Sequence, residues 1–463
     1  MEKINTVKGT KDLSGINLIM HNQVSEIFSK LCESKNFQEI RTPIIENSKV
    51  FKKTLGVASD IILKEMYNFI DQGGEEIVLR PEGTAAVARA LITNSMQDNL
   101  NKKFYYFGPM FRREKPQTGR LRQFHQVGIE IFDDKNPYND VESILIAENF
   151  LNLLGIRSKV KLEINSLGNL ESRKSYIIEL LKFLKKNSSK LSNESRKKLE
   201  TNPLRILDSK NLDDREIIEK SPILINYLDK ESKLFFDEIQ KNLKNLKIEF
   251  FVNPFLVRGL DYYNHTAFEF VTSEDKSQNT ILAGGRYDGL VSSLGGNNLS
   301  GVGWASGIER IILNLEKINI EKKVITIIAS SNDLNSYILK VLNLLDPIDG
   351  TSFHTIYSGN LKKKLIKANK MGCTGCIIIG EEEMKENKII WKNMVSGSQE
   401  KFDIEKMNDK FYSQIIDEEY LESVLGVRVY KIPLECSGDV LTEDKLDILL
   451  KLKGTENKMR DIL

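Results

Sequence analysis

The 463-residue sequence has only four cysteines and no long hydrophobic run. Four cysteines in a chain of this length are too few for a disulfide framework, so we expect a reducing, cytoplasmic setting. Apolar runs such as 324–329 and 376–379 fall far short of the roughly 20 residues that span a bilayer, which argues against a membrane protein. The N-terminus, Met1-Glu-Lys-Ile-Asn5, has an acidic residue and no apolar segment, so no secretory signal is expected.

An excess of charge of one sign is also missing, because 67 Lys and Arg residues face 65 Asp and Glu residues. The formal net charge of +2 does not by itself point to a nucleic-acid partner. The chain does have a composition typical of folded domains, with 40% hydrophobic and 29% charged residues. At roughly 150 residues per domain, its length fits about three domains.

The hydrophobic pattern changes along the chain. It predicts an amphipathic helix over 16–35, a short strand over 37–42, a long β-hairpin over 104–132 and a strand over 160–167. The stretch 171–247 is rich in Lys, Glu, Ser, Asn and Leu with helical spacing, which indicates a helical insertion between two β-rich parts.

Strand signals return at 249–252, 266–272 and 280–284, and a helix is expected over 306–317. The last part alternates between strand and helix patterns, which favours a small α/β domain with a mostly parallel sheet. Its expected elements are strands 324–330, 352–357 and 376–380 and helices 333–345 and 361–371.

The hairpin places several polar side chains on one face, because side chains alternate along a strand. That face carries Tyr106, Gly108, Met110 and Arg112 on the first arm and Phe124, Gln126, Gly128, Glu130 and Phe132 on the second. We expect Arg113 to pair with Gln123, which sets Arg112 beside Phe124. A guanidinium, a carboxamide and a carboxylate on one face fit either a binding site or a solvated β surface.

The loop of this hairpin concentrates positive charge. Residues 102–122 hold seven basic side chains and one acidic residue, Glu114, a local charge of +6. Arginine outnumbers lysine there, and its planar fork binds phosphate and carboxylate oxygens in a bidentate way. A neutral protein with such a hairpin is expected to hold a polyanion there, either a triphosphate or a nucleic-acid backbone. A merely solvated loop would consist mostly of lysine.

Three glycine-containing segments follow. Leu256-Val-Arg-Gly-Leu-Asp-Tyr-Tyr263 surrounds a glycine with an arginine and two tyrosines, whose rings suit a pocket for a flat ligand. Ala283-Gly-Gly-Arg-Tyr-Asp-Gly289 offers backbone that a ligand can approach closely. Gly301-Val-Gly-Trp-Ala-Ser-Gly-Ile-Glu-Arg310 has the pattern of a strand entering a helix, so Arg310 is expected in the first helical turn, where anions bind.

These segments resemble the motifs of class II aminoacyl-tRNA synthetases. Phe111-Arg-Arg-Glu114 and Phe124-His-Gln-Val-Gly-Ile-Glu130 resemble motif two, and Gly303-Trp-Ala-Ser-Gly-Ile-Glu-Arg310 resembles motif three. Phe37-Gln-Glu-Ile-Arg-Thr-Pro43 is similar to motif one, which in that class lies at a dimer interface.

Other segments narrow the resemblance to one family within the class. Residues 256–263 and 283–289 resemble sequences peculiar to histidyl-tRNA synthetases. Lys8-Gly-Thr-Lys-Asp12 and Arg80-Pro-Glu-Gly-Thr84 fit the same family. The resemblance runs from about residue 8 to about residue 415.

The resemblance implies an α/β fold with an α+β catalytic core: a class II antiparallel sheet flanked by helices, a helical insertion and a C-terminal α/β anticodon-binding domain. It implies activation of L-histidine with ATP to histidyl-adenylate, release of pyrophosphate, and transfer of histidine to the 3′ end of its tRNA. ATP with Mg²⁺ is then the substrate complex, with no tightly bound cofactor and no protein metal site, in a cytoplasmic homodimer. The expected domains are a catalytic core in two parts, 1–169 and 248–320, the insertion 170–247, an anticodon-binding domain 321–416, and an extension 417–463 of unknown role.

The resemblance also implies roles for single residues. Arg112 and Arg258 are implied as catalytic residues that flank the α-phosphate, and Arg310 as a contact of the γ-phosphate. The implied ATP-binding set is Arg112, Arg120, Arg258 and Arg310. The implied histidine-binding set is Glu82, Gly83, Thr84, Gln126, Glu130, Tyr262 and Tyr263. Within it, Glu82, Thr84 and Gln126 face the α-ammonium group, and Glu130 and Tyr263 the imidazole. Gln117 is implied as a contact of the tRNA acceptor end.

Two rival functions are compatible with parts of the pattern. A catalytically silent regulatory subunit of ATP phosphoribosyltransferase resembles the family, but it would lack the three arginines Arg112, Arg258 and Arg310 and the C-terminal domain. A class II synthetase for threonine or proline would not have the segment 256–263.

Three further features have structural interpretations beside functional ones. Cys373-Thr-Gly-Cys376 has the spacing of a metal or redox pair, but it runs into an apolar strand and is expected to pack in a core. Alternation turns His125 away from the catalytic face, so we expect a core histidine and no general base. The lysines of the helix 361–371 form either a solvated face or an RNA contact: Lys362, Lys363, Lys364, Lys367 and Lys370.

Overall fold

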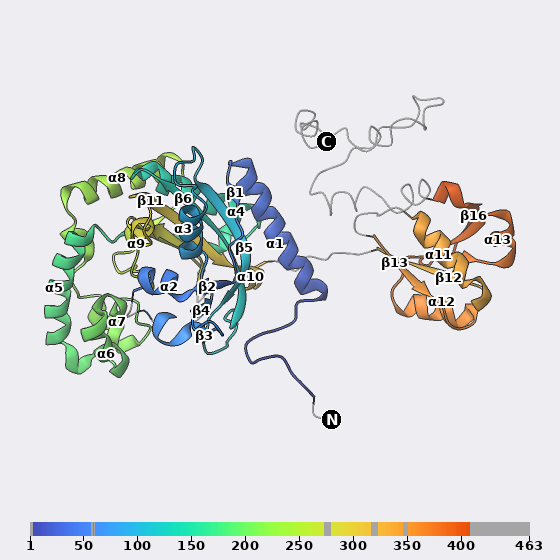
Figure 1. The fold of residues 1–463 in the computed structure, drawn as a ribbon, viewed down its shortest axis with the longest axis horizontal. Coiled ribbons are helices and arrows are strands. Elements are labelled where there is room, and N and C mark those ends of the chain that lie inside the picture. The colour runs from blue at the N-terminus through green and yellow to red at the C-terminus, as the bar shows by residue number, and fades with distance from the viewer. Residues whose placement is uncertain are drawn as a thin grey trace. The chain divides into compact units, whose positions relative to one another are not determined.

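The structure is a computed structural model of the chain, and it describes residues 3–56, 59, 61–272, 279–315, 323–345 and 351–407. The chain divides into two compact units, Met1–Lys317 and Ile318–Leu463, and each is described by itself (Figure 1). The expected extension 417–463 lies outside the described residues. Within the described residues, no helix is both long enough and apolar enough to cross a bilayer.

An eight-stranded sheet forms the centre of the first unit. In spatial order its strands are β1 (Gln38–Glu39), β5 (Lys103–Phe111), β6 (Gln123–Asp133), β11 (Ser300–Gly307), β10 (Thr280–Arg286), β9 (Asn264–Thr272), β7 (Val160–Ser166) and β8 (Phe251–Val252). The central pairs are antiparallel, and only the outermost pairs, β1 with β5 and β7 with β8, are parallel. The antiparallel sheet flanked by helices that the sequence predicted is therefore confirmed.

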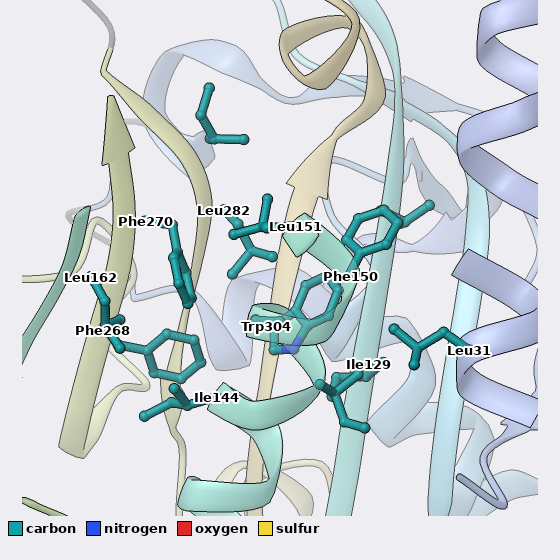
Figure 2. Packing of buried hydrophobic residues seen from close by; sticks show 14 of the residues in the cluster. Leu31, Ile129, Ile144, Phe150, Leu151, Leu162, Phe268, Phe270, Leu282 and Trp304 are labelled. Atoms are coloured by element: carbon teal, nitrogen blue, oxygen red, sulfur yellow. The ribbon is translucent and has the colours of Figure 1, made fainter. Parts of the chain in front are cut away.

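Helices α1 (Gly15–Ser34) and α4 (Pro137–Leu153) cover one face of this sheet. The inward side chains of β6 on that face, among them Ile129, pack with Phe150 of α4 and Trp304 of β11. Figure 2 shows Phe150 beside Trp304, with Leu31 of α1 nearby. The Phe150 and Trp304 rings are stacked with centroids 5.9 Å apart, and the indole N–H of Trp304 donates to the carbonyl of Ser143. Burial of large apolar side chains makes this face a core.

The opposite face of the sheet is covered by α3 (Thr84–Thr93) and the short α9 (Leu290–Ser293). Phe104, Tyr106 and Met110 of β5 pack there with Val87 and Leu91 of α3. Because side chains alternate, the even-numbered residues of β5 and β6 lie on this second face. The predicted polar face of the hairpin therefore lies on the α3 side.

The hairpin register differs from the prediction. Phe111 pairs with Gln123 and Gly108 with Gln126, whereas we expected Arg113 opposite Gln123. The expected register was wrong by two residues, because β5 ends at Phe111 and a longer loop follows. A shift of two keeps every side chain on its predicted face, since the period of a strand is two. Arg112 still lies beside Phe124, with its guanidinium 5.3 Å from the ring centroid.

Residues between α1 and β5 form elements that the sequence pattern did not predict. They comprise a three-stranded sheet of β2 (Ile45–Asn47), β4 (Glu76–Leu79) and β3 (Tyr67–Ile70), with helix α2 (Ser48–Thr54) and the π-helical turn Ile61–Glu65. The strand expected over 37–42 is reduced to β1, and the helix expected over 306–317 is only α10 (Ile308–Ile312).

The predicted insertion is helical, and its helices gather on the side of the unit away from α1 (Figure 1). They are α5 (Leu170–Lys186), α6 (Asn193–Thr201), α7 (Leu212–Ile218) and α8 (Lys230–Asn245). Each begins at a polar N-cap whose side chain accepts a backbone N–H, which stabilises the exposed first turn. The caps are Asn169, Ser192, Asn211 and Asp229. A separate apolar cluster that includes Tyr176, Leu180 and Ile206 holds the insertion together.

The second unit has a five-stranded sheet in the order β13 (Thr351–Ile356), β12 (Lys323–Ala329), β14 (Gly375–Ile379), β15 (Lys388–Asn393) and β16 (Gln399–Asp403). Its helices are α11 (Asn335–Leu344), α12 (Leu361–Lys370) and α13 (Glu381–Glu386). The first three strands are parallel as predicted, and β15 and β16 add an antiparallel edge.

Candidate active site

A polar pocket opens on the α3 side of the central sheet. Nine of the residues predicted for the site line it: Glu82, Thr84, Arg112, Arg120, Gln126, Arg258, Tyr262, Tyr263 and Arg310. They come from segments as far apart as α3 and α10, so the sheet brings the predicted motifs together. Gly83, Gln117 and Glu130 do not line the pocket.

One end of the pocket is acidic and internally bonded. Both carboxylate oxygens of Glu82 accept backbone N–H groups at the start of α3, from Thr84 at 2.7 Å and Ala85 at 2.9 Å. The hydroxyl of Thr84 donates to Glu130 at 2.6 Å. Burial raises the pKa of Glu82, against the lowering effect of these N–H bonds. This end is thus a preformed set of acceptors for a cationic or N–H-bearing group.

Glu130 lies directly behind Thr84 and is fully buried. The phenol of Tyr287 donates to its second oxygen. Burial and the nearby Glu82 together raise the pKa of Glu130 to about 8, although hydrogen bonds from Thr84 and Tyr287 oppose the rise. Glu130 does not line the pocket and is connected to it through the hydroxyl of Thr84, which does.

Two glycines, Gly83 and Gly128, allow the ring of Tyr106 to pack closely at this end of the pocket. A Cβ atom on Gly83 or on Gly128 would collide with the ring of Tyr106, which lies buried between them. Gly83 therefore contributes close packing below α3 and no pocket surface. Beside it, the side-chain oxygen of buried Gln126 has no hydrogen-bond partner among the described residues, so it is available to a ligand.

Arg112, Arg120 and Arg310 form a second group in the pocket, called the basic end here, and the carboxylates Glu114, Glu269 and Glu309 also line the pocket. Arg112 donates from Nε to the carbonyl of Pro81 at 2.9 Å, and Arg310 donates to the carbonyls of Gly119 at 3.2 Å and Thr280 at 3.1 Å. These partners are neutral, so the two charges are not compensated by them. Burial, together with the neighbouring Arg120 and Arg112, lowers the pKa of Arg310 to about 10, although Glu114 and Glu269 oppose this effect. Several cations forced together in this way favour an anionic ligand.

Arg258 also lines the pocket. Its guanidinium pairs with Glu269 and lies 5.2 Å from the ring centroid of Tyr263. The second oxygen of Glu269 accepts the hydroxyl of Thr280 at 2.8 Å. Tyr262 and Tyr263 have ring centroids 4.6 Å apart, so the predicted arginine and both tyrosines form one packed group.

Comparison with known proteins identifies the family. The model of the histidyl-tRNA synthetase family matches residues 9–311, and a model of anticodon-binding domains matches residues 323–414. The chain is 40% identical to the histidine–tRNA ligase of Gluconobacter oxydans, over 86% of this chain and 96% of that protein. It is 43% identical to that of Wolbachia pipientis, over 85% and 96%.

The chain belongs to the histidyl-tRNA synthetase family. The fold agrees: the apo histidyl-tRNA synthetase of S. aureus matches with a TM-score of 0.71 at 33% identity, over 88% of this chain and all of that one. A protein from Bacillus halodurans described as an ATP phosphoribosyltransferase regulatory subunit/histidyl-tRNA synthetase matches with a TM-score of 0.59 at 18% identity, over 82% and 99%, which shows a shared fold only.

Two residues that hold side chains of the site in place were not predicted from the sequence. Glu269 pairs with Arg258, and Tyr287 holds Glu130, yet neither was given a role. Glu269 could have been found from the sequence, because it is the only charged residue in strand β9, whose other residues are apolar or neutral. Arg286, from the glycine-rich segment 283–289, turns away from the pocket and pairs with buried Asp140.

Two residues of the motif-two loop have different positions. Arg120 lines the pocket and pairs with Glu114 at 2.8 Å. Gln117 is exposed at the tip of the loop, where its backbone pairs with that of Arg120 in a tight turn. A contact with ATP therefore fits Arg120 better, while the exposed Gln117 is open to a macromolecule.

The described residues contain one group of side chains that could hold a metal ion, formed by His21, His125 and Glu309. His125 Nδ1 lies 3.0 Å from a carboxylate oxygen of Glu309, which also accepts the backbone N–H of His125. As expected, His125 points to the face of β6 opposite Gln126. The bonds to Glu309 agree with a structural role for His125.

The cysteine pair and the lysine-rich helix of the second unit both include buried side chains. Cys373 and Cys376 are both buried in an apolar cluster beneath α12, and burial raises the pKa of Cys376 to about 12. On α12, Lys364 is buried and donates to the carbonyl of Ala329 at 3.0 Å. The other four lysines of that helix are exposed, which leaves both interpretations of their role open.

Proposed function

We propose that the pocket carries out the reaction of a histidine–tRNA ligase: it joins L-histidine to ATP as histidyl-adenylate and transfers histidine to the 3′ end of its tRNA. Membership of the family makes the chain a class II aminoacyl-tRNA synthetase. The observation that carries the residue assignment is the polarity of the pocket. Glu82, Thr84 and Gln126 supply hydrogen-bond acceptors, and Arg112 and Arg310, which hydrogen-bond to neutral carbonyls, supply positive charge.

The acidic end suits histidine. Its α-ammonium group needs hydrogen-bond acceptors, which Glu82 and the free oxygen of Gln126 supply. A neutral imidazole donates at one nitrogen and accepts at the other, so it needs one partner of each kind. Glu130 and Tyr263 form such a pair, with the Thr84 hydroxyl between Glu130 and the pocket.

The basic end suits ATP. When the histidine carboxylate attacks the α-phosphorus, an O–P bond forms and the bond to pyrophosphate breaks, while negative charge builds on the phosphate oxygens. Arg112 and Arg258, already fixed by Pro81 and Glu269, stabilise that charge without reorganisation. Arg310 and Arg120 hold the departing pyrophosphate.

Magnesium enters with ATP as part of the substrate. The carboxylates lining the pocket already have protein partners: Glu82, Glu114, Glu269 and Glu309. The ion is therefore expected to be held mainly by phosphate oxygens.

The acting form is proposed to be a cytoplasmic homodimer. Next to the segment that resembles motif one, Ile45 of β2 and Phe69 of β3 are exposed, and the strand register places both on one face of the three-stranded sheet. Exposed apolar side chains that share a face are typical of a protein interface. Sedimentation of the purified chain measures its oligomeric state.

The regulatory-subunit alternative is not favoured, because Arg112, Arg258 and Arg310 are present and meet in one pocket. ATP–pyrophosphate exchange with each of the twenty amino acids tests the proposal. Histidine alone should support exchange. Exchange with another amino acid, or with none, would overturn it.

A further inference from the structure

The segment 257–263 separates two cavities. Arg258, Leu260 and Tyr263 line both the active-site pocket and a smaller cavity on the side of the insertion. The segment forms no helix or strand, and its only regular backbone feature is a turn at 261–262. Besides the pair of Arg258 with Glu269 and the burial of Tyr263, side chains that bind the carbonyls of the segment help to set the positions of Arg258 and Tyr263.

The core and the insertion hold different parts of it. Asn165 of β7 donates to the carbonyl of Leu256 at 3.0 Å, just before the segment begins. Beyond that point the donors belong to the insertion. Arg173 of α5 donates to the carbonyls of Asp261, at 3.4 Å, and Tyr263, and Asn202 donates to the Asp261 carboxylate at 3.2 Å. Arg205 of the insertion donates to the carbonyl of Gly259.

Arg173 is itself well fixed. It lies in the first turn of α5, whose N-cap Asn169 accepts the backbone N–H of Ser172 at 2.8 Å. The hydroxyl of Ser172 also accepts the backbone N–H of Asp229, at 3.1 Å. Burial lowers the pKa of Arg173, and the nearby Asp261 opposes this effect. Two of its N–H groups donate to carbonyls, whereas its buried Nε has no hydrogen-bond partner among the described residues, so loss of the carbonyl contacts would leave the guanidinium poorly satisfied.

We propose that the helical insertion completes the histidine site, with Arg173 as a positioning residue that holds the Asp261–Tyr263 backbone so that Tyr263 and Arg258 face the pocket. Arg173 does not line the active-site pocket itself. It acts through the Tyr263 carbonyl, and the Tyr263 ring in turn packs on the Arg258 guanidinium. This inference rests on the proposed function, because it names what orients the residues of that site.

Arg173→Ala and Arg173→Lys test the inference in histidine-dependent ATP–pyrophosphate exchange. The alanine variant should raise KM for histidine roughly tenfold, the loss expected for a charge-assisted hydrogen bond, and change KM for ATP less than twofold. The lysine variant, whose ammonium can bind one carbonyl but not span two, should restore part of the loss. Hydrogen exchange of the amides in 257–263 should be faster in the alanine variant.

Arg215→Ala is the matched control, because Arg215 is an exposed insertion arginine on α7. It should leave both KM values unchanged. Asn202→Ala removes a milder contact to Asp261 and should raise KM for histidine a few-fold, which keeps the test open if Arg173→Ala does not fold. An unaltered KM for histidine in both variants overturns the inference while wild-type exchange upholds the proposed function. Absence of histidine-dependent exchange in the wild type overturns the proposed function itself.

Discussion

The two ends of the pocket are built in opposite ways. At the acidic end, Glu82 and Glu130 are bonded to protein donors before any ligand arrives. At the basic end, Arg112 and Arg310 hydrogen-bond to neutral carbonyls, and their mutual repulsion contributes to the lowered pKa of Arg310. A small amino acid is recognised by fixed geometry, whereas a polyanionic nucleotide is recognised by positive charge that it helps to compensate.

Loss of Arg258 should have the largest effect. Arg258→Ala should reduce histidine-dependent exchange by a factor of about 100–1,000, because a preorganised donor to the transition-state charge is lost. ATP binding, measured by equilibrium dialysis, should be largely spared. A pyrophosphate-exchange rate equal to that of the wild type would contradict this assignment.

Loss of Arg258 also leaves the half-buried Glu269 without its charged partner, so a control for that damage is needed. Arg157→Ala is well matched, because Arg157 pairs with Glu148 and the exposed fractions of the side chains are similar: 18% and 13%, against 14% and 16% for Arg258 and Glu269. This variant should lose comparable stability and keep its exchange activity.

Arg310→Met tests the basic end alone. It should raise KM for ATP roughly tenfold or more and leave KM for histidine within twofold, because charge-assisted bonds to phosphate are lost. Arg120→Met should have a smaller effect, since Arg120 already pairs with Glu114. If both variants raised KM for ATP equally in exchange kinetics, the ion pair of Arg120 with Glu114 would not weaken the contribution of Arg120 to ATP binding.

Thr84→Val tests the acidic end. Valine keeps the shape of threonine but removes the hydroxyl that bonds Glu130 at 2.6 Å, so a buried carboxylate loses a donor and histidine loses a polar contact. KM for histidine should rise about fivefold to tenfold at unchanged KM for ATP. Thr84→Ser keeps the hydroxyl and should stay close to the wild type. A rise in KM for ATP instead would contradict the division of the pocket.

The sequence allowed the polar hairpin face to be predicted even though the register was wrong. Arg112 and Gln126 line the pocket from the predicted face of the hairpin, because a register shift of two residues leaves each side chain on the same face. Contacts between distant segments could not be derived in this way. The partners Glu269 and Tyr287, and the position of Glu130 behind Thr84, depend on how β6, β9 and β10 pack in three dimensions.

The small sheet shows the same limit at the level of the fold. Strands β2, β3 and β4 have three or four residues each, too short for a periodic pattern to stand out. The helix after β11 was overestimated because its apolar spacing continues beyond Ile312, where the described helix ends. The insertion was predictable because long amphipathic helices repeat their pattern over several turns.

The smallest expected effect concerns stability and pH at the acidic end. Folded Glu130 has a pKa of about 8, above the ordinary value of 4.5, so the folded state binds more protons than the unfolded state between these values. The wild type should therefore lose stability as the pH rises from about 4.5 to about 8.

The variant Glu130→Gln does not titrate at this position and lacks that loss. The melting temperature of the variant minus that of the wild type should increase by a few degrees between about pH 5 and about pH 8. Buried acids remote from Glu130 are common to both proteins and cancel in the difference, whereas Glu82 interacts with Glu130 and contributes to it. A difference that stays constant with pH would mean that Glu130 is already ionised in the folded protein, and that both ends of the pocket hold their charges before a ligand binds.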